Sequence, residues 1–245
     1  KGAAKVILTA PGKGSLKNIV YGINDDQMSP DDKIITAASC TTNAIAPVLK
    51  VVNDKFGIEH GHVETVHAYT NDQNLIDNYH KAERRGRAAA LNMVITETGA
   101  AKAVSKALPE LEGKLTGNAI RVPTPNVSLI DLVVEVEKNT SIEEVNQAFK
   151  VASQKSLNKI IRFEEKPLVS IDFNGDACSS IVDGISTKVI EGNMVKVLSW
   201  YDNEWGFCNR MLDNSLALLN AQNETNVALD MEANYADQPT NDLVA

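Results

Sequence analysis

The sequence has few cysteines, no long hydrophobic run and no excess of basic residues, and each shortage excludes a class of protein. Its three cysteines stand far apart without a CxxC pair. This argues against a disulfide framework or a zinc site and favours a reducing compartment, so we expect a cytoplasmic protein. No apolar run approaches the roughly 20 residues of a membrane span. The net charge of −8 argues against a nucleic-acid partner, which needs clustered Lys and Arg.

Short apolar runs separated by Pro and Gly open the chain, a pattern typical of strands joined by loops. The strands that we predict in the first part cover residues 5–9, 18–23, 34–38 and 63–69. After the third of these strands the apolar positions change to helical spacing, so a helix begins near Cys40. Residues 71–87 are polar and aperiodic and predict a long loop, and a short helix follows Gly99.

The second half carries further strands and two helices. Ser141 with Glu144 forms a capping box that opens a helix through residue 152. The strands predicted here cover residues 127–137, 168–173, 179–183, 186–190 and 194–200. Their succession along the chain favours antiparallel pairing. A last helix starts near Asn203, and the apolar side chains that share one of its faces are Cys208, Met211, Leu212 and Leu219.

The predicted fold class is α/β, with an α+β catalytic domain built on a mixed, largely antiparallel sheet. The first three strands and the last helix look like parts of a neighbouring α/β domain. The chain begins on Lys1 without Met and enters an apolar stretch almost at once, which suggests a piece of something longer. Residues 222–245 contain acidic residues but no Lys or Arg, and we expect a disordered tail there.

Cys40 is the first candidate for chemistry, because it stands at the predicted switch from strand to helix. A helix start stabilises a thiolate, so we expect a lowered pKa for this thiol. The alternative is a small buried hydrophobe in the core. Four polar residues, Ser39, Thr41, Thr42 and Asn43, surround the cysteine. Such a neighbourhood suits an anion better than a core.

His67 is the candidate base for a cysteine nucleophile. It closes a predicted strand, and sites in open α/β sheets gather at strand ends. A structural histidine remains the alternative at this position. His60 and His62 lack a third metal ligand at a sensible spacing, so we interpret them as surface residues.

Three further features suit an anionic ligand. Arg121 is a charged residue in an apolar run, which indicates either a phosphate clamp or a buried ion pair. Thr98 and Gly99 precede a helix, a layout typical of an anion-binding turn. Arg85 lies in a cluster of basic residues, which is unexpected in a chain with a net negative charge and therefore needs an explanation.

Taken together, several blocks resemble the phosphorylating glyceraldehyde-3-phosphate dehydrogenase family in order and spacing, from the first residues to about Leu219. The blocks are Ala38-Ser39-Cys40-Thr41-Thr42-Asn43, His67-Ala68-Tyr69-Thr70, Thr98-Gly99-Ala100-Ala101-Lys102-Ala103, Arg121-Val122-Pro123 and Trp200-Tyr201-Asp202-Asn203-Glu204. The family's dinucleotide fingerprint, G-x-G-x-x-G after a first strand, does not occur. We therefore expect a fragment that lacks most of its nucleotide-binding domain.

The resemblance implies a mechanism and roles for individual residues. Cys40 would attack the aldehyde of glyceraldehyde 3-phosphate, with His67 as base, to give a hemithioacetal. Hydride would then pass from the hemithioacetal to NAD or NADP and leave a thioester on Cys40. Inorganic phosphate would release this thioester as 1,3-bisphosphoglycerate, in glycolysis or gluconeogenesis. Thr70 and Arg121 would hold the substrate phosphate, and Asn203 would bind the nicotinamide. The residues that would hold the attacking phosphate are Ser39, Thr41, Arg85, Thr98 and Gly99.

The resemblance also implies an organisation of the chain. Residues 1–39 would be the last strands of an NAD(P)-binding domain, and residues 40–202 the catalytic domain. Residues 203–221 would be a C-terminal helix that returns to the first domain. The family forms homotetramers through faces of the catalytic sheet, so we expect the same assembly. Residues 78–79, Asn-Tyr, replace a Leu-Pro pair of NAD-specific members, which leaves the choice between NAD and NADP open.

Three other functions stay open. Erythrose-4-phosphate dehydrogenase shares the same chemistry, although residues 70–73 and 124–126 look more like the triose enzyme. A cysteine hydrolase would use Cys40 and His67 but would have no use for Asn203. A non-catalytic assembly or binding fragment would need none of these three residues for catalysis.

Overall fold

The computed structural model describes residues 2–222. Of the tail predicted at residues 222–245, only Gln222 is described, as the last residue of a helix, and the rest lies outside the described residues. The strands are β1 (Val6–Leu8), β2 (Ile34–Thr36), β3 (Ile58–Ala68), β4 (Val94–Glu97), β5 (Leu115–Val122), β6 (Ser128–Val136), β7 (Ile161–Glu164), β8 (Ser180–Asp183), β9 (Lys188–Ile190) and β10 (Met194–Tyr201). The α-helices are α1 (Cys40–Phe56), α2 (Ala100–Val104), α3 (Ile142–Gln154) and α4 (Trp205–Gln222).

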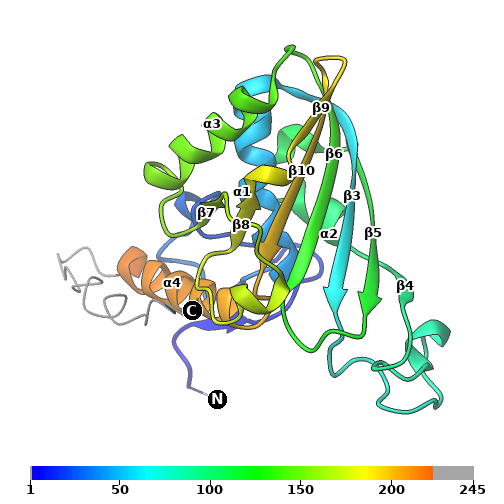
Figure 1. Cartoon of the computed structure of the whole chain (residues 1–245). Helices are drawn as coiled ribbons and strands as arrows, with labels where there is room; N and C mark the ends of the chain where they lie inside the picture. The colour runs from blue at the N-terminus through cyan, green and yellow to red at the C-terminus, as the bar shows by residue number, and fades with distance from the viewer. Residues whose placement is uncertain (1, 223–245) are drawn as a thin grey trace, which may run out of the picture.

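An eight-stranded sheet forms the body of the molecule, with strand order β4-β5-β3-β6-β10-β8-β7 and β9 paired to β10 (Figure 1). Parallel pairing is confined to β3–β5 and β7–β8 in this sheet, and the other neighbours are antiparallel. The predicted fold class, α/β with a mixed and largely antiparallel sheet, is confirmed.

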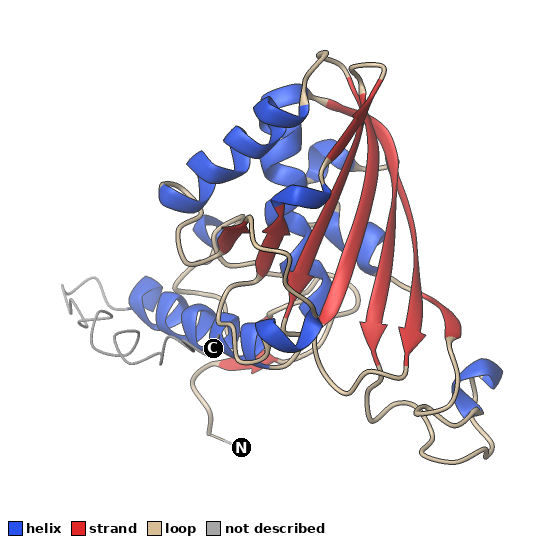
Figure 2. Cartoon of the chain, in the orientation of Figure 1, coloured by secondary structure: helices blue, strands red, loops and turns tan. Residues whose placement is uncertain are grey.

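The sheet buries one face under helices and leaves the other face without them (Figure 2). Along β6, buried residues alternate with half-buried ones, as expected for a strand with one packed face. The buried positions pack with α1 and α3 in one main core, which includes Ile130, Leu132 and Phe149. Among residues 2–222, no helix combines the length and the apolar character that crossing a membrane requires.

The N-terminal segment forms a separate small unit. Strands β1 and β2 pair in parallel, and Ile19 and Ile35 pack there against Leu218 of α4. The strand predicted at residues 18–23 is wrong, because only Asn18 makes a bridge to a strand. The chain then turns, since Ile23 N donates to Val20 O.

Other sequence-based predictions differ from the structure in the second half. Residues 168–173 do not form a strand. Val169 N donates to Asp172 Oδ2 at 2.8 Å and a 3-10 turn follows at Ser170–Phe173, because a local carboxylate cap competes with sheet pairing. Strands β4, β5 and β7 were not predicted.

The last helix, α4, packs on a different face from the one predicted. Cys208 and Leu212 are exposed, whereas Arg210 and Asp213 are almost completely buried and form an ion pair of 2.6 Å. Arg210 also donates to Lys159 O at 3.1 Å. Charged side chains that satisfy one another can occupy a core position that the apolar pattern assigns to leucine.

Candidate active site

Cys40 is the first residue of α1, as predicted, and Ser39 is the N-cap. Ser39 Oγ accepts the N–H of Thr42 at 3.0 Å, which satisfies one of the unpaired donors at the helix start. The turn before it is tight: Ala38 has a φ of 58°, a conformation uncommon for residues other than glycine. Strand β2 therefore passes into the helix within a few residues and presents the thiol at the turn.

His67 lies close to the thiol. Its Nε2 is 3.6 Å from Cys40 Sγ, and its Nδ1 is 2.6 Å from the carbonyl oxygen of Ala68. Arg121 Nη1 also lies 3.2 Å from Nδ1, but its two hydrogens go to Ala68 O and Thr70 Oγ1. Because a carbonyl oxygen only accepts, Nδ1 is assigned the hydrogen in the neutral ring. Nε2 is then the acceptor that faces the sulfur. The pair is arranged for transfer of the thiol proton to His67.

Burial sets the protonation of both groups. Burial, and then the charge of Arg121, lowers the pKa of His67 to about 4. Burial raises the pKa of the Cys40 thiol above its usual value, against the opposing effects of Thr41 and Arg121. The expected lowering of this pKa by the helix start is therefore wrong, because desolvation outweighs it. Near neutral pH the resting pair is a thiol and a neutral imidazole.

The lowered pKa of His67 makes the stability of the fold depend on pH. An unfolded histidine titrates near 6.5 and the folded His67 near 4. Between these values the unfolded chain binds one more proton, so the free energy of unfolding falls as the pH falls, by about 3 kcal/mol in total. The free energy of unfolding can be measured with urea at about pH 7.5 and about pH 4.5. The difference between these two free energies should be smaller for His67→Asn than for the wild type.

The matched control for this measurement is His62→Asn, on the same strand β3 but with a half-exposed side chain. The free energy of unfolding of this variant should change between the two pH values by as much as that of the wild type. A His67→Asn protein with the full wild-type difference would contradict the assigned pKa.

Arg121 lies beside the histidine, because β3 and β5 run parallel with His67 opposite Arg121. Its Nη1 donates to Ala68 O at 3.1 Å and to Thr70 Oγ1 at 3.2 Å. Its Nε is buried and has no hydrogen-bond partner among residues 2–222. A buried cation with a spare donor next to a hydroxyl suits an anion.

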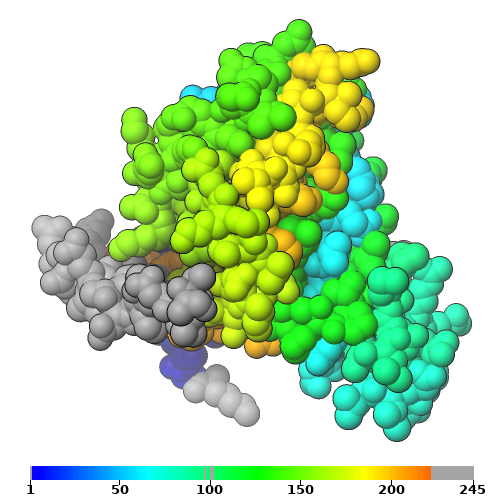
Figure 3. Space-filling model, in the orientation of Figure 1, coloured from blue at the N-terminus to red at the C-terminus, as the bar shows by residue number. Residues whose placement is uncertain are grey.

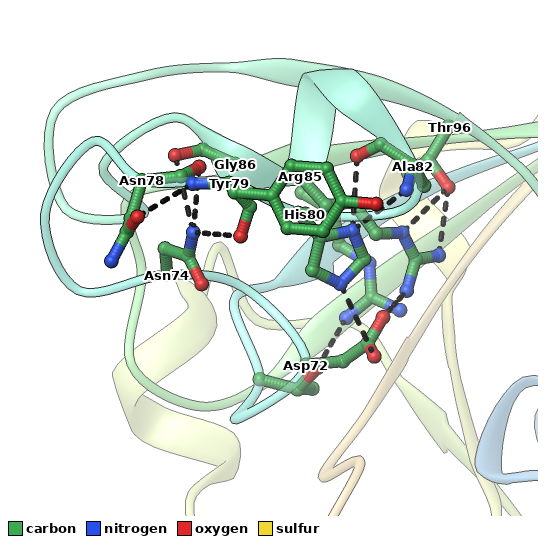
Figure 4. A network of polar contacts seen from close by, with 11 residues as sticks. Asp72, Asn74, Asn78, Tyr79, His80, Ala82, Arg85, Gly86 and Thr96 are labelled. Carbon is green, nitrogen blue, oxygen red and sulfur yellow. Dashed lines mark hydrogen bonds and ion pairs between the residues drawn. The ribbon is translucent and has the colours of Figure 1, made fainter.

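The loop at residues 71–87 projects from the end of the sheet (Figure 3) and carries Arg85. The Arg85 guanidinium donates to Thr96 Oγ1 of β4 and pairs with Asp72, which also lies 3.7 Å from His80 (Figure 4). Burial, and then the Arg85 charge, lowers the pKa of Arg121. Arg85 thus acts on the site through its charge, while its own donors are engaged by Asp72 of the loop and by Thr96 of β4.

A cavity of about 870 Å³ lies beside this loop. The ionisable side chains that line it are Asp72, His80, Lys81, Glu83, Arg84 and Arg85. Positive and negative groups are mixed there, so the basic cluster of the sequence is partly neutralised within its own loop.

Thr98 and Gly99 stand at the start of α2, as predicted, with Gly99 as the N-cap. Helix α2 packs against α1 and β5. The two residues therefore lie beside the elements that carry Cys40 and Arg121.

His60 and His62 lie on the exposed part of β3, where His60 pairs with Glu135 at 3.3 Å.

Asn203 and the residues around it complete the site from the end of β10. Asn203 Oδ1 accepts the hydroxyl of Ser128 at 2.8 Å, and Ser128 Oγ accepts Ala68 N at 3.0 Å. Tyr201 reaches the other side, with its hydroxyl 3.1 Å from Thr41 Oγ1. Sequence reasoning missed Ser128 and Tyr201, because a serine and a tyrosine in alternating strands look like ordinary sheet residues.

Comparison with known proteins identifies the family. The sequence model of the family "Glyceraldehyde 3-phosphate dehydrogenase, C-terminal domain" matches residues 39–203. The chain is 55% identical over 210 residues to "Glyceraldehyde-3-phosphate dehydrogenase 1" of Bacillus cereus, a match that covers 85% of this chain and 63% of the relative.

Two further relatives extend the comparison. "Glyceraldehyde-3-phosphate dehydrogenase" of Priestia megaterium is 55% identical over 86% of this chain and 64% of its own length. The "Glyceraldehyde-3-phosphate dehydrogenase-like protein" of Pseudomonas aeruginosa is 60% identical over 84% of this chain and 45% of its own. The matched part of the chain thus spans less than two thirds of the length of each of these relatives. With two thirds of its residues matched by the family model, the chain belongs to the glyceraldehyde 3-phosphate dehydrogenase family.

Proposed function

We propose that the full-length protein oxidises glyceraldehyde 3-phosphate to 1,3-bisphosphoglycerate with NAD or NADP, in glycolysis or gluconeogenesis. The observation that carries this proposal is the approach of Cys40 Sγ to the unprotonated Nε2 of His67, at 3.6 Å, with Arg121 at the opposite side of the ring. The relatives bear the name of this dehydrogenase.

Cys40 and His67 divide the covalent chemistry between them. As the sulfur attacks the aldehyde carbon, its proton passes to Nε2 of His67, and the N–H so formed donates to the developing oxyanion. The resulting hemithioacetal is oxidised to a thioester on Cys40. A bound nicotinamide supplies the hydride acceptor for this oxidation. Inorganic phosphate then attacks the thioester carbon, and the Cys40 sulfur leaves, giving the acyl phosphate.

Two groups of residues would hold phosphate. Arg121 and Thr70 would bind the substrate phosphate, an assignment supported by their mutual hydrogen bond and by the unpartnered Nε of Arg121. The attacking phosphate would meet a second group around the start of α1 and α2. Its members are Ser39, Thr41, Arg85, Thr98 and Gly99.

The nicotinamide would meet Asn203. The amide oxygen of this side chain is held by Ser128, and no hydrogen bond among residues 2–222 involves its Nδ2. An amide with a spare donor fits the carbonyl of a carboxamide, so the residues present suit a nicotinamide ring.

The domain organisation is part of the proposal. Residues 1–39 and 203–221 would complete a nucleotide-binding domain, and residues 40–202 would form the catalytic domain. Two features support this division. A two-stranded sheet such as β1–β2 is marginal by itself, and its Val6 and Ile34 are exposed, as is Leu212 of α4.

We propose a homotetramer in the cytoplasm for the complete protein. The helix-free face of the sheet, with half-buried Val133 and Leu198, would provide a subunit interface. The three cysteines are free thiols, and a reducing compartment would keep Cys40 in that state.

A coupled assay tests the function. The full-length protein, mixed with glyceraldehyde 3-phosphate, inorganic phosphate and NAD or NADP, should produce the reduced nicotinamide, which is measured by its absorbance. The reaction should be much slower with unphosphorylated glyceraldehyde, because Arg121 then has no substrate phosphate to bind. Faster turnover of erythrose 4-phosphate would favour the tetrose enzyme. Aldehyde or ester turnover without cofactor would favour a cysteine hydrolase, and no turnover at all a binding fragment.

A further inference from the structure

Ser128 occupies the point where three parts of the candidate site meet. It is the first residue of β6, which lies between β3 and β10 in the sheet. Only 1% of Ser128 is exposed. Strand β3 ends beside it with His67 and Ala68, and β10 leads into Asn203. A single buried hydroxyl therefore lies within reach of both chain segments.

The hydrogen bonds of Ser128 have a definite direction. The backbone N–H of Ala68 can only donate, so Ser128 Oγ accepts at 3.0 Å. The hydroxyl proton then goes to Asn203 Oδ1 at 2.8 Å. In this arrangement the hydroxyl of Ser128 binds the oxygen end of the Asn203 amide. Nδ2 is then the end of the amide that Ser128 leaves free.

The backbone of Asn203 is held independently by its neighbour. Asp202 Oδ1 accepts the N–H groups of Glu204 and Trp205 at the start of α4. Its Oδ2 accepts from Gly175 N at 2.8 Å. The position of the main chain is therefore secured by Asp202, and the one remaining freedom of Asn203 is the rotation of its side chain.

We propose that Ser128 is a positioning residue for the cofactor: its hydroxyl holds the Asn203 amide with Nδ2 turned towards a nicotinamide carboxamide. The inference rests on the proposed function. It also couples two groups that the sequence keeps far apart, since the same hydroxyl holds the backbone next to His67. Loss of this hydroxyl frees the amide to rotate and leaves the Ala68 N–H without its acceptor.

Cofactor binding in the absence of substrate tests this role. In the full-length protein, Ser128→Ala should weaken the binding of NAD or NADP about tenfold by calorimetric titration. It should raise KM for the cofactor more than it lowers kcat. The control is Ser199→Ala in the adjacent strand β10. Ser199 is equally buried, but its Oγ has no hydrogen-bond partner among the described residues, so cofactor binding should not change.

A double-mutant cycle separates positioning from a general structural effect. If Ser128 acts through Asn203, the double variant Ser128→Ala/Asn203→Ala should bind cofactor no more weakly than Asn203→Ala alone. Fully additive losses, or wild-type binding by Ser128→Ala, would overturn the inference. Should Ser128→Ala fail to fold, the nearly isosteric Ser128→Cys, a much weaker donor, replaces it in the same cycle.

The two proposals fail in different ways. A wild-type protein that binds neither NAD nor NADP overturns the proposed function and this inference with it. A wild-type protein that binds cofactor, with an unaffected Ser128→Ala variant, overturns the role of Ser128 alone.

Discussion

Replacing Cys40 by Ser should reduce the dehydrogenase activity of the full-length protein by about 10⁴-fold or more. The hydroxyl of serine is a far weaker acid than a thiol and a poorer leaving group. His67 Nε2, 3.6 Å from the sulfur, would therefore neither activate it for attack nor let phosphate displace it from an ester. The initial rate of cofactor reduction measures the loss, and mass spectrometry of the protein after mixing with substrate measures the acyl adduct.

Cys208→Ser is the matched control for this experiment. Cys208 is exposed on α4, outside the contacts that surround Cys40, and its replacement should leave rate and adduct unchanged. An acyl adduct on the Cys40→Ser protein, or an undiminished rate, would contradict the role of Cys40 as the carrier.

Replacing His67 by Asn should lower kcat by about 10²–10⁴-fold, the usual contribution of a general base. The size of the effect follows from the protonation of the pair. Burial raises the pKa of the Cys40 thiol and lowers that of His67 to about 4, so the sulfur still carries its proton when the aldehyde arrives. Without an acceptor at Nε2, that proton must leave to water from a desolvated site.

Alkylation of Cys40 by iodoacetamide gives a second measure of the same role. At neutral pH the His67→Asn protein should react more slowly than the wild type, because no base then accepts the thiol proton as the sulfur attacks the reagent. His62→Asn, which changes a partly exposed side chain of the same strand, should match the wild type in both assays. Near-normal turnover by His67→Asn would remove the histidine from the mechanism.

Local signals in the sequence predicted the elements that depend on local contacts. The capping box of Ser141 and Glu144 is present, with both of its hydrogen bonds formed. The helix start at Cys40 is also as predicted, since the change from alternating to helical spacing is a property of the segment itself. The resemblance to the family, confirmed by the match over residues 39–203, rested on five short blocks, one of which is this helix start at Cys40.

Elements that depend on distant partners could not be predicted in this way. Strand β5 includes Gly117 and Asn118, residues that are poor strand formers, and it forms because β3 and β4 pair on either side of it. The buried face of α4 is polar because Lys159 O and Asp213 are available to Arg210. Asp213 is a local partner, three residues along the same helix, but the Lys159 carbonyl is 51 residues away from Arg210 in the chain and cannot be identified from the spacing of residues along one helix.

Some residues of the candidate site could be predicted from local signals in the sequence, and others could not. Cys40 stands out by its polar neighbours at a predicted helix start, His67 by its place at the end of a predicted strand, and Arg121 by its charge in an apolar run. Ser128 and Tyr201 have no such mark, and their positions follow from the sheet register, in which Ser128 lies opposite Tyr201. The roles of all these residues remain predictions until the variants are measured.

Helix α4 joins two places that are far apart. Asn203 lies just before its first turn, and Leu218, near its other end, packs with Ile19 and Ile35 beside β1 and β2. With a rise of about 1.5 Å per residue, these ends are about 20 Å apart. Between these ends, the buried Arg210 is anchored to Lys159 O. If the helix pivots there, a displacement of about 1 Å at Leu218, about 12 Å away, tilts the helix by about 5° and moves its Asn203 end in the opposite direction.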